Sequence, residues 1–152
     1  MKITELQTPA ILVNMDYMEH NLKKYCNLAR KYKKQIWPMI KTHKSTELAK
    51  LQQEYGCTGF LCGNLDEAEA MIKAGMKNVM YAYPVATDVS IARVLTLTKL
   101  CDTFYIRIDG VDAAKLINDS ASISGVVVKY TIIVDSGLHR FGVAPNKVVE
   151  LA

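Results

Sequence analysis

The segment QIWPMIKTHKSTELAKLQQEYGCTGFLCG, residues 35–63, contains one complete strand–helix–strand pattern. It begins with an apolar, β-prone run, QIWPMIK, which ends at Lys41. Ser45 follows as a candidate N-terminal cap for the helical stretch TELAKLQQEY, and Gly56 is suited to end that helix. The apolar run TGFLCG is the next predicted strand. The segment therefore predicts a β/α unit that places an amine at the end of a buried strand.

The same pattern repeats along the chain. Apolar runs start roughly every 20 to 27 residues, and each is followed by a stretch with helical character. Six strands are predicted, at residues 8–14, 35–41, 58–63, 78–84, 102–109 and 128–135. Asp16, Asn64 together with Glu67, and Asp88 are the start signals of three further helices, and Pro145 marks the start of the last one. Because strands and helices alternate without a Pro/Gly/Ser-rich linker, we expect one domain with a parallel sheet covered by helices.

Two architectures are compatible with this alternation. A doubly wound open sheet normally carries a glycine-rich first turn at its ligand site, and the first turn here, VNMDYM, has no glycine. A (β/α)8 barrel needs about 200 to 250 residues. This chain has 152 residues and stops within its sixth predicted helix. A barrel is therefore expected only if the chain is the N-terminal part of something longer.

Composition and charge argue against several classes of protein. Half of the residues are hydrophobic, 22% are charged, and the formal net charge is +4, as in ordinary globular domains. No nucleic-acid recognition motif accompanies the basic stretch KKYCNLARKYKK. No apolar run approaches the ~20 residues of a membrane span, and the N-terminus lacks a signal-peptide pattern, which favours a cytoplasmic protein. The four cysteines and three histidines lack metal-site spacing, so reduced thiols and no metal centre are expected.

Four motifs, in this order, resemble the N-terminal barrel of the fold type III pyridoxal-phosphate enzymes. They are TPAILVN (8–14), KTHKSTELAKLQ (41–52), EAEAMIKAG (67–75) and IIVDSGLHRFGV (132–143). The resemblance is closest to the D-threonine aldolase and D-serine dehydratase branch, which is related to the N-terminal domain of alanine racemase. It implies a (β/α)8 TIM-type barrel of which residues 1–152 supply the first six β/α units. The C-terminal barrel strands and the β-domain of such enzymes are absent from this chain.

The resemblance implies that Lys41 carries pyridoxal 5'-phosphate as an imine. An amine at the end of a barrel strand, walled by apolar neighbours, loses hydration and is more easily deprotonated, so Lys41 can also act as a base at the substrate's α-carbon. Position alone favours a strand-end lysine that reaches solvent, and the surrounding motif reverses that preference. Lys44, one turn later, is expected to face solvent and to be the less suitable imine former.

Arg140 is the second cofactor residue that the resemblance implies, through a contact with the cofactor's phenolic oxygen. A guanidinium there would stabilise phenolate charge. The alternative is a loop arginine that pairs with Asp135 or with solvent. His43 is expected to contact the cofactor or a substrate carboxylate, or to have no special role. Gly137 and Gly142 are expected to serve the backbone geometry of this loop.

The resemblance implies an aldolase, dehydratase or racemase that acts on a D- or β-hydroxy-amino acid, working as a homodimer. The alternative is a non-catalytic pyridoxal-phosphate-binding protein of the homeostasis type. Trp37, Pro38 and Met39 replace the Arg-Pro-His that is common in the branch, which leaves the substrate and the reaction open. Any divalent metal would bind residues outside this chain, and the 152-residue segment alone is expected to be inactive.

Overall fold

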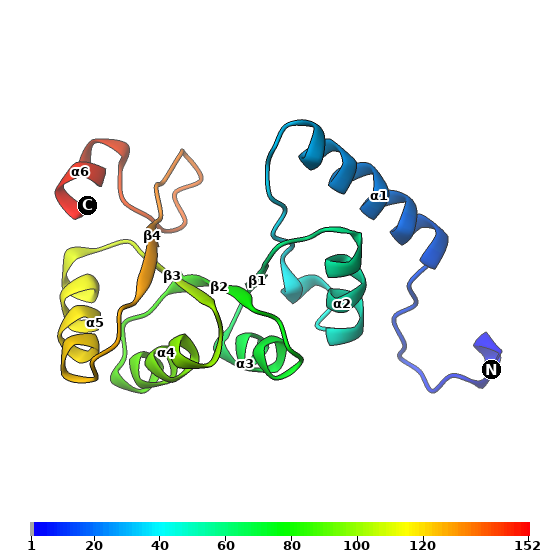
Figure 1. Ribbon diagram of the computed structural model, residues 1–152, viewed down its shortest axis with the longest axis horizontal. Coiled ribbons are helices and arrows are strands. Elements are labelled where there is room, and N and C mark those ends of the chain that lie inside the picture. The colour runs from blue at the N-terminus through cyan, green and yellow to red at the C-terminus, as the bar shows by residue number, and fades with distance from the viewer. Residues whose placement is uncertain (1) are drawn as a thin grey trace. The chain divides into compact units, whose positions relative to one another are not determined.

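The computed structural model describes residues 2–152, which divide into two compact units, one ending at Gln35 and the other spanning Ile36–Ala152 (Figure 1). The first unit holds a short 3-10 turn, Ile3–Glu5, and the helix α1, Met15–Lys31. No helix among the described residues combines the length and apolar character that crossing a membrane demands.

Two predictions for the first unit are wrong. Residues 8–14 form no strand, and the side chain of Ile11 is 94% exposed. An extended run becomes a strand only when its backbone pairs with a neighbour, and the described part of this unit contains no other strand. The cap of α1 is Asn14 and not Asp16, since the Asn14 side chain accepts a hydrogen bond from the Tyr17 N–H at 3.0 Å. Asp16 lies in the first turn, where its carboxylate interacts favourably with the positive end of the helix dipole.

The second unit contains a parallel sheet with the strand order β1-β2-β3-β4. Its strands are β1 Phe60–Cys62, β2 Asn78–Pro84, β3 Thr103–Ile108 and β4 Lys129–Ile132. Its helices are α2 Thr46–Tyr55, α3 Leu65–Lys73, α4 Asp88–Leu100, α5 Val111–Ile123 and α6 Val148–Leu151, the last preceded by a 3-10 turn at Pro145–Lys147. The third to sixth predicted strands are thus confirmed, as is the α/β alternation.

The predicted strand at residues 35–41 is wrong as a strand, although part of it runs beside β1. The Leu61 N–H donates to the Pro38 carbonyl at 2.9 Å, and Met39 forms a single parallel bridge with Leu61. Proline has no N–H to donate, so the ladder cannot continue through Pro38. After Met39 the chain turns at once into a 3-10 turn, Ile40–Thr42.

Helices cover one face of the sheet. Figure 1 shows α3, α4 and α5 along the same side of the strands. On β3 this face carries Phe104, Ile106 and Ile108, which are buried, while the residues between them are half-buried. Ser45 and Asn64 cap α2 and α3 as predicted. The helix α4 starts at Asp88 as predicted, and Thr87 is its cap. Because all four strands are parallel, their carboxyl ends and the loops that follow them share one edge of the sheet.

Candidate functional site

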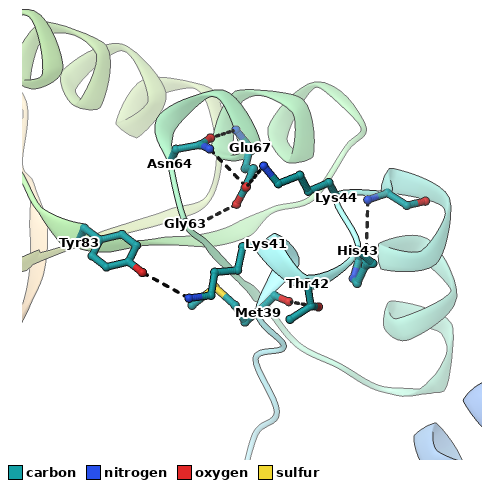
Figure 2. Close-up of polar contacts among 10 residues, drawn as sticks. Met39, Lys41, Thr42, His43, Lys44, Gly63, Asn64, Glu67 and Tyr83 are labelled. Atoms are coloured by element: carbon teal, nitrogen blue, oxygen red, sulfur yellow. Dashed lines mark hydrogen bonds and ion pairs between the residues drawn. The ribbon is translucent and has the colours of Figure 1, made fainter. Parts of the chain in front are cut away.

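Lys41 lies at this edge, on the 3-10 turn that follows Met39. Ile40 is completely buried and anchors the turn, and its carbonyl accepts hydrogen bonds from the backbone N–H groups of His43 and Lys44 at 3.0 and 2.8 Å. The Lys41 side chain is exposed, which differs from the apolar surroundings expected from the sequence. Its amine points toward Tyr83 (Figure 2).

Tyr83, the penultimate residue of β2, joins the two principal predicted site residues. The Lys41 Nζ donates a hydrogen bond to the Tyr83 Oη at 3.3 Å, and the Arg140 Nη2 donates to the same oxygen at 3.1 Å. These contacts lower the pKa of the Tyr83 phenol, first through the hydrogen bond from Lys41 and then through that from Arg140. The sequence did not single out Tyr83, because within NVMYAYP it looks like one more aromatic residue of a strand.

The loop after β4 presents Arg140. Its turn is built by Asp135, whose carboxylate accepts hydrogen bonds from the backbone N–H groups of Gly137 at 2.9 Å and His139 at 3.0 Å. These bonds lower the pKa of Asp135, with a further contribution from the His139 ring, whose Nδ1 lies 2.8 Å from the carboxylate. Asp135 therefore pairs with His139, and the alternative pairing with Arg140 does not occur.

Two aromatic rings hold the Arg140 guanidinium. Its Cζ lies 5.4 Å from the centroid of the Tyr83 ring and 5.1 Å from that of Phe141. These two rings are 5.6 Å apart and meet edge to face. Gly142 follows with a φ of 107°, and a Cβ there would lie 2.9 Å from the Asp135 backbone nitrogen. A residue with a side chain at this position would therefore be both strained and crowded. The predicted backbone role of Gly142 is confirmed.

The double contact at Tyr83 predicts a titration that can be measured without any cofactor. Replacing Arg140 with leucine should raise the Tyr83 pKa toward that of an ordinary phenol, because a nearby cation that favours the phenolate is lost. The pH dependence of the tyrosine ζ-carbon chemical shift in ¹³C-labelled protein would follow it. Arg93→Leu is the matched control, since Arg93 pairs with Asp66 and Glu69 and should leave Tyr83 unchanged. An identical Tyr83 titration in both variants would contradict the contact.

His43 is not brought together with Lys41 and Arg140. Its Nδ1 accepts a hydrogen bond from the Ser45 N–H at 3.1 Å, and the Gln52 side chain of α2 lies near its ring. The His43 Nε2 and the Gln52 Oε1 are both buried, and neither has a well-formed hydrogen bond within residues 2–152. Burial lowers the pKa of His43, and the nearby Gln52 side chain opposes this change. A cofactor contact by His43 stays a prediction.

Lys44 is exposed, as predicted, but its amine also has a partner. Its Nζ forms an ion pair with the Glu67 Oε1 at 3.4 Å. Glu67, expected only to support the start of α3, is buried, with 8% of its surface exposed. The signal for this role was present in the sequence as a glutamate three residues after the cap residue Asn64, but spacing does not show which side chains converge on the carboxylate.

Comparison with known families and proteins agrees with this fold. Residues 13–152 match the alanine racemase N-terminal domain, and the chain belongs to this family. It is 30% identical over 154 residues, 100% of its length, to 3-hydroxy-D-aspartate aldolase from Paracoccus denitrificans. It is also 30% identical over 141 residues, 93% of its length, to D-threo-3-hydroxyaspartate dehydratase from Delftia sp. strain HT23. These alignments cover 40% and 37% of the two relatives, so the chain spans about two fifths of their length.

A solved structure gives the same result for the fold. The crystal structure of D-threonine aldolase from Filomicrobium marinum superposes with a TM-score of 0.88 at 24% identity, covering 94% of this chain and 38% of that one. The α/β fold of the alanine racemase N-terminal domain, which is TIM-barrel-like, is thereby confirmed. The family resemblance predicted from the four motifs is also confirmed.

Proposed function

We propose that this chain belongs to a pyridoxal-phosphate-dependent enzyme that cleaves, dehydrates or racemises a D- or β-hydroxy-amino acid. In this proposal residues 1–152 form the N-terminal part of a (β/α)8 barrel and supply its first six β/α units. Four parallel strands in chain order and the family match support that placement. The activities of the aldolase and dehydratase relatives support the enzyme over the non-catalytic carrier. A homodimer and a cytoplasmic location belong to the same proposal.

One observation carries the proposal: an amine and a guanidinium converge on a single phenol oxygen. Lys41 and Arg140 come from segments far apart in the sequence, yet both donate to the Tyr83 Oη. Pyridoxal phosphate carries an aldehyde next to a phenolic oxygen. An amine suits the aldehyde, and a guanidinium suits an oxygen that holds negative charge. The donor set at this edge of the sheet therefore fits the cofactor.

When bound, pyridoxal phosphate acts as an electron sink for negative charge at the substrate's α-carbon. Lys41 would hold the cofactor covalently through Nζ and then move a proton at that carbon. Arg140 would face the phenolic oxygen. An amine can serve as a base in catalysis, whereas a guanidinium acts in proteins as a fixed charge with several donors. Lys41 is thus the group that exchanges a proton, and Arg140 is the fixed positive charge.

His43 has a supporting place in this proposal. Its hydrogen bond with Ser45 joins the turn that carries Lys41 to the cap of α2, and Gln52, farther along that helix, lies near the ring. Cradles for the cofactor's phosphate and pyridine nitrogen, and any metal ligands, are assigned to parts of the enzyme outside this chain.

A substrate panel tests the proposed reaction class. Full-length protein supplied with pyridoxal phosphate should act on at least one of 3-hydroxy-D-aspartate, D-threonine and D-serine, or racemise alanine. An aldehyde with glycine would identify an aldolase, ammonia with a keto acid a dehydratase, and loss of optical rotation a racemase. Tight cofactor binding without any of these products would contradict the enzyme and favour the carrier.

A further inference from the structure

Two lysines lie close together in one loop, which raises the question of which amine bonds to the cofactor. Lys41 and Lys44 are three residues apart, and both side chains are exposed. Figure 2 shows that their amines point in different directions, that of Lys41 toward Tyr83 and that of Lys44 toward Glu67. Glu67 is also the one charged residue that is buried among residues 2–152. Burying a carboxylate is unfavourable for stability unless it is paired and hydrogen-bonded, so the contacts of Glu67 indicate its role.

The Glu67 carboxylate ties together the segments around Lys41. Its Oε2 accepts a hydrogen bond from the Gly63 N–H at 2.7 Å, immediately after β1. Its Oε1 accepts from the Asn64 side chain at 3.3 Å and pairs with the Lys44 Nζ at 3.4 Å. Glu67 itself lies in the first turn of α3. One side chain therefore connects the end of β1, the start of α3 and the turn that carries Lys41.

Gly63 lies close to both this carboxylate and the Lys41 stem. A Cβ built on Gly63 would lie 3.1 Å from the Lys41 Cβ and 3.3 Å from the Glu67 Oε2. The Lys41 stem and the carboxylate thus border the same small space at Gly63.

Lys44 adopts a backbone conformation that suits the ion pair. Its φ is 50°, in the left-handed region, which is unfavourable for a residue with a Cβ. The ion pair with the buried Glu67 and the backbone hydrogen bond to Ile40 help to offset that cost. In this conformation the Lys44 amine is engaged by Glu67, and Lys41 is left as the amine directed at Tyr83.

We propose that Glu67 is a positioning residue that assigns the covalent role to Lys41. It fixes the turn through Gly63, and it engages Lys44, the competing amine. This inference rests on the proposed function, since it concerns which amine bonds to pyridoxal phosphate. It adds a residue that the family motif at Lys41 does not contain.

The test measures where the cofactor becomes attached. Full-length wild type and Glu67→Gln are loaded with pyridoxal phosphate, reduced with borohydride and digested with a protease that does not cut at lysine. Mass spectrometry then gives the label at each lysine. Wild type should carry its label on Lys41. In Glu67→Gln the share on Lys44 should rise about fivefold, which corresponds to an ion pair of about 1 kcal/mol.

Two further variants make the test specific. Glu69→Gln removes a carboxylate from the same helix that pairs with Arg93, and it should keep the wild-type distribution. Should Glu67→Gln fail to fold, Glu67→Asp retains the charge but shortens its reach to Gly63, and a rise in the Lys44 share would support the inference. Wild type labelled on Lys41 with an unchanged distribution in the folded Glu67 variant would overturn the inference alone. Wild type with no label on either lysine would overturn the proposed function.

Discussion

Replacing Lys41 with alanine should abolish the borohydride-stable attachment of pyridoxal phosphate and lower turnover by about a thousandfold or more. Fold stability should change little, by about 0.5 kcal/mol or less, because the Lys41 side chain is exposed and alanine keeps the Cβ that faces Gly63. Attachment is measured by mass spectrometry after reduction, turnover with the substrate identified by the panel, and stability by urea unfolding.

Lys50→Ala is the matched control for this experiment. Lys50 lies on the surface of α2, where it pairs with Glu47 at 2.9 Å, and its loss should leave both attachment and turnover intact. Label persisting at the wild-type level in Lys41→Ala would show that another amine holds the cofactor, and the assignment of Lys41 would then be wrong.

Replacing Gly59 with alanine should destabilise the second unit by about 1 to 3 kcal/mol. A Cβ at Gly59 would lie 2.4 to 2.6 Å from atoms of the Trp37 indole, closer than any packed contact allows. The indole is itself held against Tyr105, with ring centroids 6.0 Å apart. Either the ring or the backbone beside it must move. Trp37 is the only tryptophan, so its fluorescence during urea unfolding reports directly on this contact.

Gly110→Ala is the matched control for Gly59→Ala. A Cβ at Gly110 meets no atom within 4 Å, and its φ of −165° is ordinary extended backbone. Its effect should be limited to the smaller loss expected when alanine replaces glycine at a helix N-terminal cap. Equal urea midpoints for the two variants would contradict the packing argument.

The parts of the fold that depend on nearby residues were predictable. Ser45 and Asn64 cap their helices because a side-chain oxygen reaches a backbone N–H three residues on, and sequence shows that spacing directly. The start of α1 was predicted two residues late, since both Asn14 and Asp16 are good caps. The choice between them depends on where the backbone leaves its extended conformation.

The strands show where local pattern is insufficient. The runs that became β1 to β4 have neighbours on which to pair, whereas residues 8–14 have an equally apolar pattern and no partner strand within the described part of their unit. In the run 35–41 the breaking residue, Pro38, was visible in the sequence. Where the missing N–H of Pro38 interrupts a ladder depends on the strand beside it, and the sequence does not show that this strand is β1.

The candidate site divides in the same way. Lys41 and Arg140 follow from motifs, but their meeting point, Tyr83, depends on the alignment of three separate chain segments. Glu67 was read as a helix-start residue, and its contact with Lys44 crosses between segments. Sequence spacing therefore misses contacts between separate segments of the chain. Here the missed residues are Tyr83, which contacts Lys41, and Glu67, which contacts Lys44.

The separation of the site residues along the chain has a consequence for biosynthesis. Lys41 and Tyr83 are 42 residues apart, and Tyr83 and Arg140 a further 57. Contacts over such separations form late, because the intervening chain must be ordered first. A nascent chain emerging from the ribosome would expose Lys41 long before Arg140 is synthesised. During that interval the Lys41 amine lacks the contacts that Tyr83 and Arg140 complete. We therefore expect the cofactor to bind correctly only after the loop that follows β4 has folded.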